Sequence, residues 1–298
     1  MDTMNHCAPV DVRLRDGDLK NISNEIRAEV YRWMLETRTE KFRDFLWWLQ
    51  KFRYGACSCL RGNLMEHYYC ALRFPDDVAD GHHPLPDGYA TRPDYVEERL
   101  AFARDPTTPK DAIDQLLQHC YHLAEQLGFS LKIETQHMLE SILFDALRRG
   151  KNIVFPKDIL EKNFFALDID GTISASLKIF GEDPAYCRAL QALGTATRKY
   201  YNGEDFRIDV DQDGLINIPE GDMMQFGISP AALHDPHSSA VRSWLQHEAQ
   251  EGMVLLDTHE KTMKSMSLRR LTRFTLKNVY QKPARKFFTN ELNVHRLP

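Results

Sequence analysis

Apolar side chains recur at intervals of three and four residues through most of the 298-residue chain, the spacing that one face of an α-helix requires. Segment 24–50 has a broad apolar face. The same pattern covers residues 64–78, 109–127, 135–149, 185–207, 241–256 and 267–288, with a short helix near 220–226. Alternating strand patterns are nearly absent. The sequence therefore predicts an all-α protein.

Local signals mark where some helices end. Gly150 closes the helix predicted at 135–149, and the Pro- and Gly-rich stretch 82–93 predicts a loop. No internal repeat divides the chain. We expect one helical bundle with a central cavity over residues 19–298, preceded by a flexible polar segment, 1–18.

Composition narrows the function classes. A hydrophobic content of 43% with 27% charged residues is ordinary for a soluble globular protein. No apolar run approaches the ~20 residues of a membrane span, and the polar N-terminus lacks a signal peptide pattern, so we expect a cytoplasmic protein. A net charge of −5 argues against nucleic-acid binding. The six cysteines show no zinc spacing and are interpreted as reduced thiols.

Charge is uneven along the chain. From Lys261 to the end there are ten Lys and Arg residues and a single acid, Glu291. We interpret this stretch as a solvated helix face; a phosphate-facing lid and a peripheral contact with a membrane surface are the alternatives.

Two aspartate pairs carry the main chemical signal. Asp76 and Asp80 form one, and Asp205 and Asp209 form the other. Residues four apart share one face of a helix, about 6 Å apart along the axis. Two such faces turned toward each other would form an oxygen-lined cage for Mg²⁺, which shares carboxylates with substrate phosphates. The alternative is that each pair lies on a solvated helix face.

Two shorter motifs suggest other chemistry. Residues 209–220 place acids at positions 1, 3, 5 and 12 and Gly214 at position 6, as in a calcium-binding EF-hand loop, but no partner loop is present. Asp168-Ile-Asp170-Gly-Thr is similar to the nucleophile motif of haloacid-dehalogenase-type phosphatases. That fold requires alternating strands and helices, which the pattern around Asp168 lacks.

A third interpretation covers more of the chain. YYCALRFPDDVADG (68–81) resembles the first aspartate-rich motif of the squalene/phytoene synthase family, and GTISASLKIFG (171–181) resembles its GTVG segment. LGTATRKYYNGEDFRID (193–209) is similar to the second aspartate-rich motif, and GLINIPEGDMMQFGIS (214–229) to the loop and short helix that follow it. The order and spacing of these segments carry the resemblance.

The resemblance implies an all-α isoprenoid-synthase fold and a Mg²⁺-dependent prenyltransferase that binds prenyl diphosphates. Asp76, Asp80, Asp205 and Asp209 would hold the metal ions, and Arg73 would contact a diphosphate oxygen or the aspartates. Aromatic side chains would line the pocket of the prenyl cation. Tyr69, Tyr201 and Phe165 are the expected substrate-binding residues, with Tyr68, Phe74 and Phe164 as further candidates.

Departures from the family pattern leave the acceptor open. Tyr201 stands where the family has Asn, Glu204 replaces the Arg that precedes the second pair, and Asp168 and Asp170 add acids ahead of Gly171. The main hypothesis is head-to-head coupling of two prenyl diphosphates. One alternative is transfer of a prenyl group to a non-isoprenoid acceptor such as an aromatic compound, whose proton the extra acids would take. A non-catalytic binding role is the other.

Overall fold

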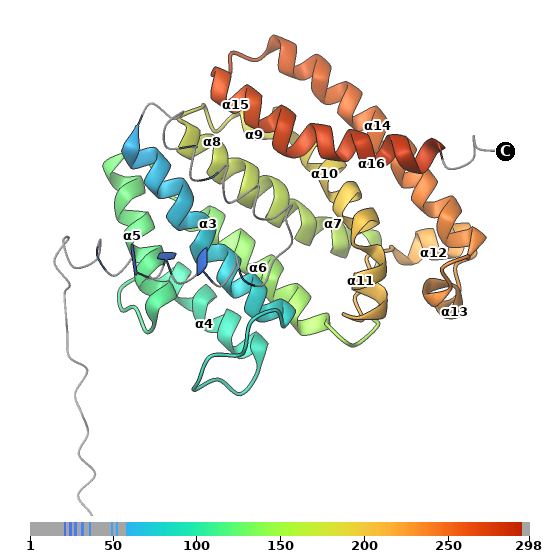
Figure 1. Cartoon of the computed structure of the whole chain (residues 1–298), viewed down its shortest axis with the longest axis horizontal. Helices are drawn as coiled ribbons and strands as arrows, with labels where there is room; N and C mark the ends of the chain where they lie inside the picture. The colour runs from blue at the N-terminus through green and yellow to red at the C-terminus, as the bar shows by residue number, and fades with distance from the viewer. Residues whose placement is uncertain are drawn as a thin grey trace, which may run out of the picture.

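The computed structural model contains helices throughout the part of the chain that it describes, and no strand there (Figure 1). It describes residues 58–293 together with Asn21, Asn24, Glu25, Arg27, Ala28, Tyr31, Arg32, Glu36, Leu49 and Phe52. The predicted all-α class is confirmed. The segment predicted to be flexible, 1–18, and most of the helix predicted at 24–50 lie outside the described residues. Across the described part, every helix falls short of the length and apolar character that crossing a bilayer requires.

Four helices form one half of the bundle. They are α3 (Cys59–Asp80), α4 (Arg92–Arg104), α5 (Ala112–Gln126) and α6 (Lys132–Arg148). α3 packs against α5 and α6, and α4 packs against α6 (Figure 1). Leu64, Ala71, Leu116 and Leu139 are fully buried in the apolar cluster that joins them. Burial of this shared apolar face stabilises the half.

Side-chain caps and a glycine set the ends of these helices. The side chains of Ser58, Thr91 and Asp111 each accept a hydrogen bond from a backbone N–H in the first turn of α3, α4 and α5. Gly81, with φ of 82°, ends α3 directly after Asp80. The first aspartate pair therefore lies on the last turn of a well-defined helix.

A continuous helix runs through the middle of the molecule. It comprises α7 (Lys157–Phe165), the π-helix η1 (Ala166–Ile173) and α8 (Ser174–Phe180), a region that the apolar pattern did not single out. A Cβ on Gly171 would lie 2.5 Å from Cγ of Met138 in α6, and one on Gly194 would lie 2.6 Å from Cγ1 of Ile169. The central helix approaches its two neighbours this closely because both glycines lack a side chain.

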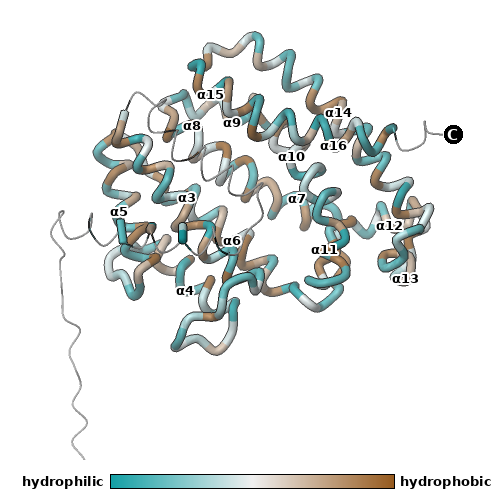
Figure 2. The backbone as a smooth tube through the Cα atoms, viewed as in Figure 1, coloured by the Kyte–Doolittle hydropathy of each residue, from teal (hydrophilic) through white to brown (hydrophobic). Residues whose placement is uncertain are grey.

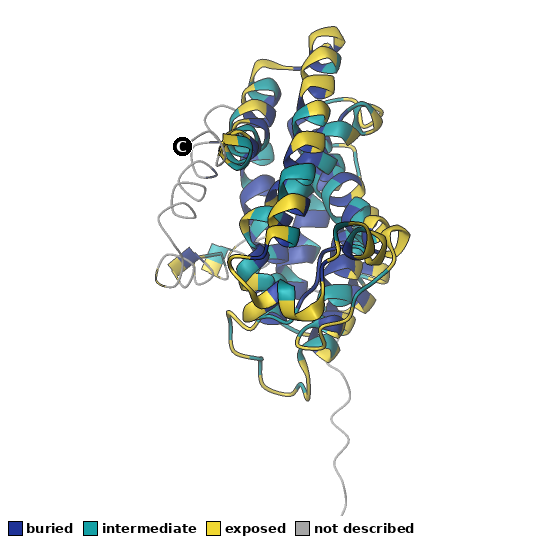
Figure 3. Cartoon of the chain, turned by 90° about the vertical axis from the view of Figure 1, so that its right-hand side faces the viewer, coloured by how far each residue is buried: buried dark blue, intermediate teal, exposed yellow. Residues whose placement is uncertain are grey.

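The remaining helices form the second half. They are α9 (Tyr186–Ala189), α10 (Gln191–Glu204), α11 (Phe206–Asp211), α12 (Glu220–Phe226), α13 (Pro230–His234), α14 (Ser239–Ser265), α15 (Arg270–Thr275), the π-helix η2 (Leu276–Gln281) and α16 (Lys282–Asn293). α10, α14 and α16 pack together around Tyr200, Leu256 and Phe288. Figure 2 shows that each helix contains both apolar and polar residues. Figure 3 shows that the buried residues lie mainly on the faces where helices meet.

The helix predicted at 185–207 is in fact interrupted. Leu190 and Asp205 both leave helical geometry, with φ near −90° and ψ near 0°, and so separate α9, α10 and α11. The N–H of Asp209 still donates to the carbonyl oxygen of Asp205 at 2.9 Å. The two acids of the second pair therefore remain one turn apart.

The basic C-terminal stretch matches the predicted solvated face. Its exposed cations are Lys261, Lys264, Arg269, Arg270, Lys277, Lys282 and Lys286, on α14, α15, η2, α16 and the connecting loop.

The packing of Gly171 leads to a stability prediction. In Gly171→Ala the new methyl group would overlap Met138 and would lie 2.8 Å from the carbonyl oxygen of Ala166, so we expect a loss of about 1–3 kcal/mol in the free energy of unfolding. Urea denaturation measures it. Gly221→Ala is the matched control, because no atom lies within 4 Å of its added Cβ, and its stability should be unchanged or slightly higher. Equal stability of the two variants would contradict close packing at η1.

Candidate active site

Arg73 contacts Asp76, the first member of the first aspartate pair, from within α3. Its Nη1 lies 2.7 Å from Oδ2 of Asp76, and its Nη2 donates to Oδ1 of the fully buried Asp77 at 2.6 Å. Burial alone would lower the pKa of Arg73, but the surrounding acids and tyrosines, Asp76 foremost, hold that pKa above its ordinary value. Arg73 therefore stays charged beside the pair.

The surroundings of Asp80 disfavour a bare carboxylate. Burial and the neighbouring Asp76 carboxylate raise the pKa of Asp80 to about 8, although Arg149 and Arg73 act in the opposite direction. An additional cation next to this pair would stabilise the ionised form.

In the second pair, too, burial and a neighbouring carboxylate raise the pKa of one aspartate. Asp205 lies at the junction of α10 and α11, and Asp209 follows one turn later in α11. Burial and the Asp205 carboxylate raise the pKa of Asp209 to about 7. The side-chain amide of Asn217 opposes this shift by donating to Oδ2 of Asp209 at 2.8 Å. In both pairs, burial and the neighbouring carboxylate raise the pKa of one aspartate.

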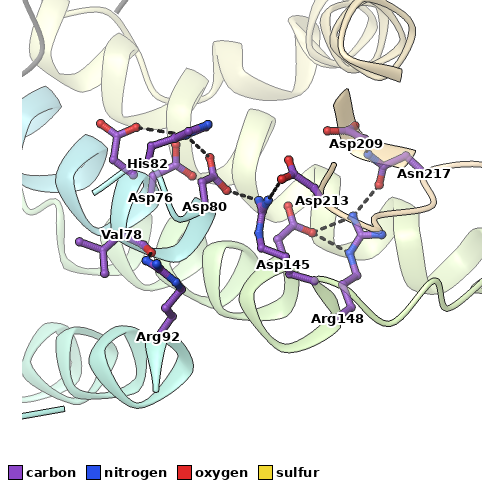
Figure 4. A network of polar contacts seen from close by, with 12 residues as sticks. Asp76, Val78, Asp80, His82, Arg92, Asp145, Arg148, Asp209, Asp213 and Asn217 are labelled. Carbon is purple, nitrogen blue, oxygen red and sulfur yellow. Dashed lines mark hydrogen bonds and ion pairs between the residues drawn. The ribbon is translucent and has the colours of Figure 1, made fainter. Parts of the chain in front are cut away.

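Two adjacent arginines at the end of α6 connect the two pairs (Figure 4). Arg149 forms an ion pair with Asp80 and a second with Asp213, where its Nη1 lies 2.6 Å from the carboxylate. Arg148 contacts Asp145 at 2.8 Å and donates to the side-chain oxygen of Asn217, the residue that binds Asp209. A chain of contacts therefore runs from Asp80 to the loop that follows the second pair.

The cage expected from the sequence is not formed by the carboxylates themselves. In the described part of the chain, no three His, Cys, Asp or Glu side chains come together closely enough to hold a metal ion. The physical reason is seen at Asp80, where the guanidinium group of Arg149 lies beside the carboxylate in place of a metal ion. Two crowded pairs nevertheless fit Mg²⁺, which typically binds one or two carboxylates and completes its shell with phosphate oxygens and water.

The EF-hand alternative is not supported. Its first three acids have different partners: Asp209 accepts from Asn217, Asp211 pairs with His234 at 2.9 Å, and Asp213 pairs with Arg149. Side chains directed to three different partners do not form one calcium cage.

The phosphatase alternative is also not supported, because its nucleophile motif requires alternating strands and helices. Asp168 lies in η1, on a helix, and its carboxylate is held by both Nε and Nη2 of Arg198, at 2.7 and 2.9 Å. The guanidinium carbon of Arg198 lies 4.7 Å from the ring centroid of Phe164. A carboxylate engaged by both its oxygens in this way is poorly suited to act as a nucleophile.

The predicted substrate-binding residues come from three helices. Tyr69 lies on α3, one turn before Arg73, and both Tyr69 and Tyr201 of α10 help to raise the pKa of Arg73. Tyr201 is 37% exposed, and Phe165 of α7 lines a pocket. Of the further candidates, Tyr68 is a core residue, because it is buried and its hydroxyl is hydrogen-bonded to Thr135 at 3.0 Å. Phe74 packs against His83, with ring centroids 4.4 Å apart.

The pocket beside Phe165 has a volume of about 70 Å³ and is partly open to solvent. It lies between α7, η1, α10, α12 and α14, and Asn217 connects its wall to Asp209. Its charged lining residues are the cations Lys157, Arg198 and Lys199 and the acids Glu161, Asp168, Asp222 and Glu248. The lining is therefore nearly neutral in net charge.

Comparison with solved structures identifies this arrangement of helices. Squalene synthase HpnC from Alicyclobacillus acidocaldarius superposes with a TM-score of 0.64 at 18% identity, over 91% of this chain and 96% of that one. The chain has the squalene synthase fold. A dehydrosqualene synthase in complex with ligand gives a TM-score of 0.62 at 15% identity, over 94% and 89% of the two chains. No family model matches the sequence, and no curated protein does.

The fold implied by the motifs is thus confirmed, and within this squalene synthase fold the structure adds residues that the sequence did not indicate. Arg148 and Arg149 were missed because basic residues at the end of a helix are ordinarily interpreted as partners of the helix dipole. The sequence did not indicate Asn217, because in its loop the acids alone match a known metal-binding pattern. The one available signal was the consecutive pair of arginines immediately before Gly150.

The raised pKa values make the stability of the metal-free protein depend on pH. Asp80 and Asp209 have folded pKa values of about 8 and about 7, above the ordinary 3.8, so between these limits the folded state binds more protons than the unfolded state. The free energy of unfolding therefore falls as the pH rises through this window. We expect the melting temperature in EDTA to fall from pH 6 to about pH 8.5, and Asp80→Asn to flatten that fall.

Differential scanning calorimetry across this pH range is the measurement. Glu97→Gln, at an exposed acid of α4, is the control and should keep the wild-type slope. An unchanged slope in Asp80→Asn would show that Asp80 does not titrate in this range.

Proposed function

We propose that the protein is a Mg²⁺-dependent prenyltransferase that ionises an allylic prenyl diphosphate and couples the prenyl group head to head to a second prenyl diphosphate. The main support is the occurrence, within a squalene synthase fold, of two aspartate pairs in each of which one carboxylate raises the pKa of the other. Such pairs suit the divalent metals that a diphosphate leaving group requires.

Each group of residues has a distinct part in this proposal. Asp76, Asp80, Asp205 and Asp209 would hold the Mg²⁺ ions, which when bound neutralise the charge that develops on the leaving diphosphate. Arg73 is held charged beside the first pair and would contribute further positive potential there. The aromatic side chains at positions 69, 201 and 165 offer faces that stabilise a cation without attacking it. Exclusion of water from that space would prevent hydrolysis.

A second candidate function differs only in the acceptor. The pocket beside Phe165 has three cations against four carboxylates, so it has no positive excess for a second diphosphate. Glu204, in place of an arginine, adds a further acid ahead of the second pair. These observations favour transfer of the prenyl group to an uncharged acceptor, such as an aromatic compound. Asp168, in the lining of this pocket, would have to leave Arg198 to take the proton of that acceptor, and Asp170 is the alternative base.

One set of incubations separates these candidates. Purified protein with Mg²⁺ is given dimethylallyl, geranyl, farnesyl or geranylgeranyl diphosphate separately, and diphosphate release and organic extracts are followed by mass spectrometry. A hydrocarbon or cyclopropyl dimer supports head-to-head coupling. Release only after addition of aromatic acceptors supports the second candidate, and intact activity of the Asp168→Ala and Asp170→Ala variants would exclude the proton-transfer role. No release, and no shift in melting temperature with Mg²⁺ and donor, would indicate a non-catalytic protein.

The metal assignment makes a sharper prediction. We expect Asp76→Asn to lower the rate of diphosphate release by about 100-fold or more, because loss of one group that stabilises developing charge costs that much in comparable sites. The fold should persist, since the Asp76 side chain is 33% exposed. Asp158→Asn, at an exposed acid of α7, is the control for the loss of one negative charge. Wild-type rates in Asp76→Asn would refute the assignment.

A further inference from the structure

Arg149 occupies an unusual position for a charged side chain at the end of a helix. It is the last residue associated with α6, its side chain is only 17% exposed, and its two terminal nitrogens contact two different carboxylates. Asp80 belongs to α3, whereas Asp213 follows α11, and its Oδ1 lies 2.6 Å from Nη1 of Arg149. One cation therefore joins the first aspartate pair to the loop that follows the second (Figure 4).

The backbone next to Arg149 is fastened to the same loop. The N–H of Gly150 donates to the carbonyl oxygen of Asp213 at 2.7 Å, and that of Asn152 donates to Gly214 at 3.1 Å. Gly214 has φ of 59°, and a Cβ there would lie 2.8 Å from Cα of Gly150, so the two segments are in direct contact. The guanidinium group can leave Asp80 only by rotation of its own side chain, while the backbone and Asp213 keep it nearby.

The ion pair uses the carboxylate that a metal ion would need. An oxygen of Asp80 that accepts from a guanidinium cannot at the same time be a ligand of a divalent cation at close range, because the two positive charges repel. Because both partners are largely buried, moving Arg149 away without a replacement cation would leave the Asp80 carboxylate uncompensated. A divalent ion that takes Oδ1 of Asp80 as its ligand would therefore displace Arg149 from that oxygen.

We propose that Arg149 is a tethered counter-ion that competes with divalent metal for Asp80 and, when displaced, offers its donors to a diphosphate. This inference rests on the proposed metal-dependent function and assigns Arg149 a positioning role at the same site. It follows that metal alone binds weakly and that metal and diphosphate favour each other's binding. Guanidinium groups suit this exchange because their planar array of donors matches phosphate as well as carboxylate oxygens.

Calorimetric titration of the EDTA-treated full-length protein with MgCl₂, with and without inorganic pyrophosphate, tests the proposal. In Arg149→Gln we expect Mg²⁺ alone to bind about 10-fold more tightly than in the wild type, and the gain in affinity that pyrophosphate gives to fall by a similar factor. A purely structural role for Arg149 would have the opposite effect on Mg²⁺ alone, because a disordered site binds metal less tightly.

Two further variants keep the test decisive. Arg149→Lys keeps the charge with a different donor geometry and should lie between wild type and Arg149→Gln if the latter is folded normally. Arg104→Gln removes an exposed ion pair with Glu140, 2.8 Å long, and should match the wild type. Clear binding of Mg²⁺ with equal affinity in wild type and Arg149→Gln would overturn this inference alone. Absence of Mg²⁺ binding in every protein, with and without pyrophosphate, would overturn both the inference and the proposed function.

Discussion

Buried negative charge is the constraint on which the organisation of this helical bundle depends. A carboxylate removed from water costs several kcal/mol unless a cation and hydrogen bonds compensate it. Around the candidate site four arginines provide this compensation: Arg73 for Asp76 and Asp77, Arg148 for Asp145, Arg149 for Asp80 and Asp213, and Arg198 for Asp168. Arg149, at the end of α6 in the first half, pairs with Asp80 of the same half and with Asp213 of the second half. This cation therefore joins the two halves electrostatically.

α6 is the helix that transmits this coupling. Along its length it packs against α3 and α4 on one side and against η1 on the other, where the absence of a side chain at Gly171 permits close approach. Its final turn presents Arg148 and Arg149 to the two aspartate regions. The packing determines the direction of α6. This direction in turn determines that the guanidinium groups of Arg148 and Arg149 lie between the two aspartate regions. Apolar packing and the geometry of the site are thus parts of one arrangement.

Much of the fold could be predicted from the sequence, because helical period and capping are local properties. The positions of Asp76, Asp80, Asp205 and Asp209 within their helical turns, and the order of the motifs, were sufficient to predict the squalene synthase fold. The break at Asp205 and the π-helical turn around Asp168 could not be predicted, since tertiary packing decides such irregularities. The bridge from Arg149 to Asp80 joins residues 69 positions apart. No periodicity detects a contact of that range, and for the same reason the sequence suggested a carboxylate cage where the structure has arginines between carboxylates.

The choice of acceptor depends on how much positive charge the site can offer. A second prenyl diphosphate adds a highly charged anion, and the pocket beside Phe165 has acids in slight excess over cations. Head-to-head coupling would therefore require both diphosphates to share the Mg²⁺ ions and arginines at the two aspartate pairs. Only the prenyl chains would then enter this pocket. An uncharged acceptor needs no such sharing, because ion pairs such as Arg198–Asp168 already balance the charges around it. Arg149 bears on the first case most directly, since its guanidinium group, once released from Asp80, would be an additional cation for a second diphosphate.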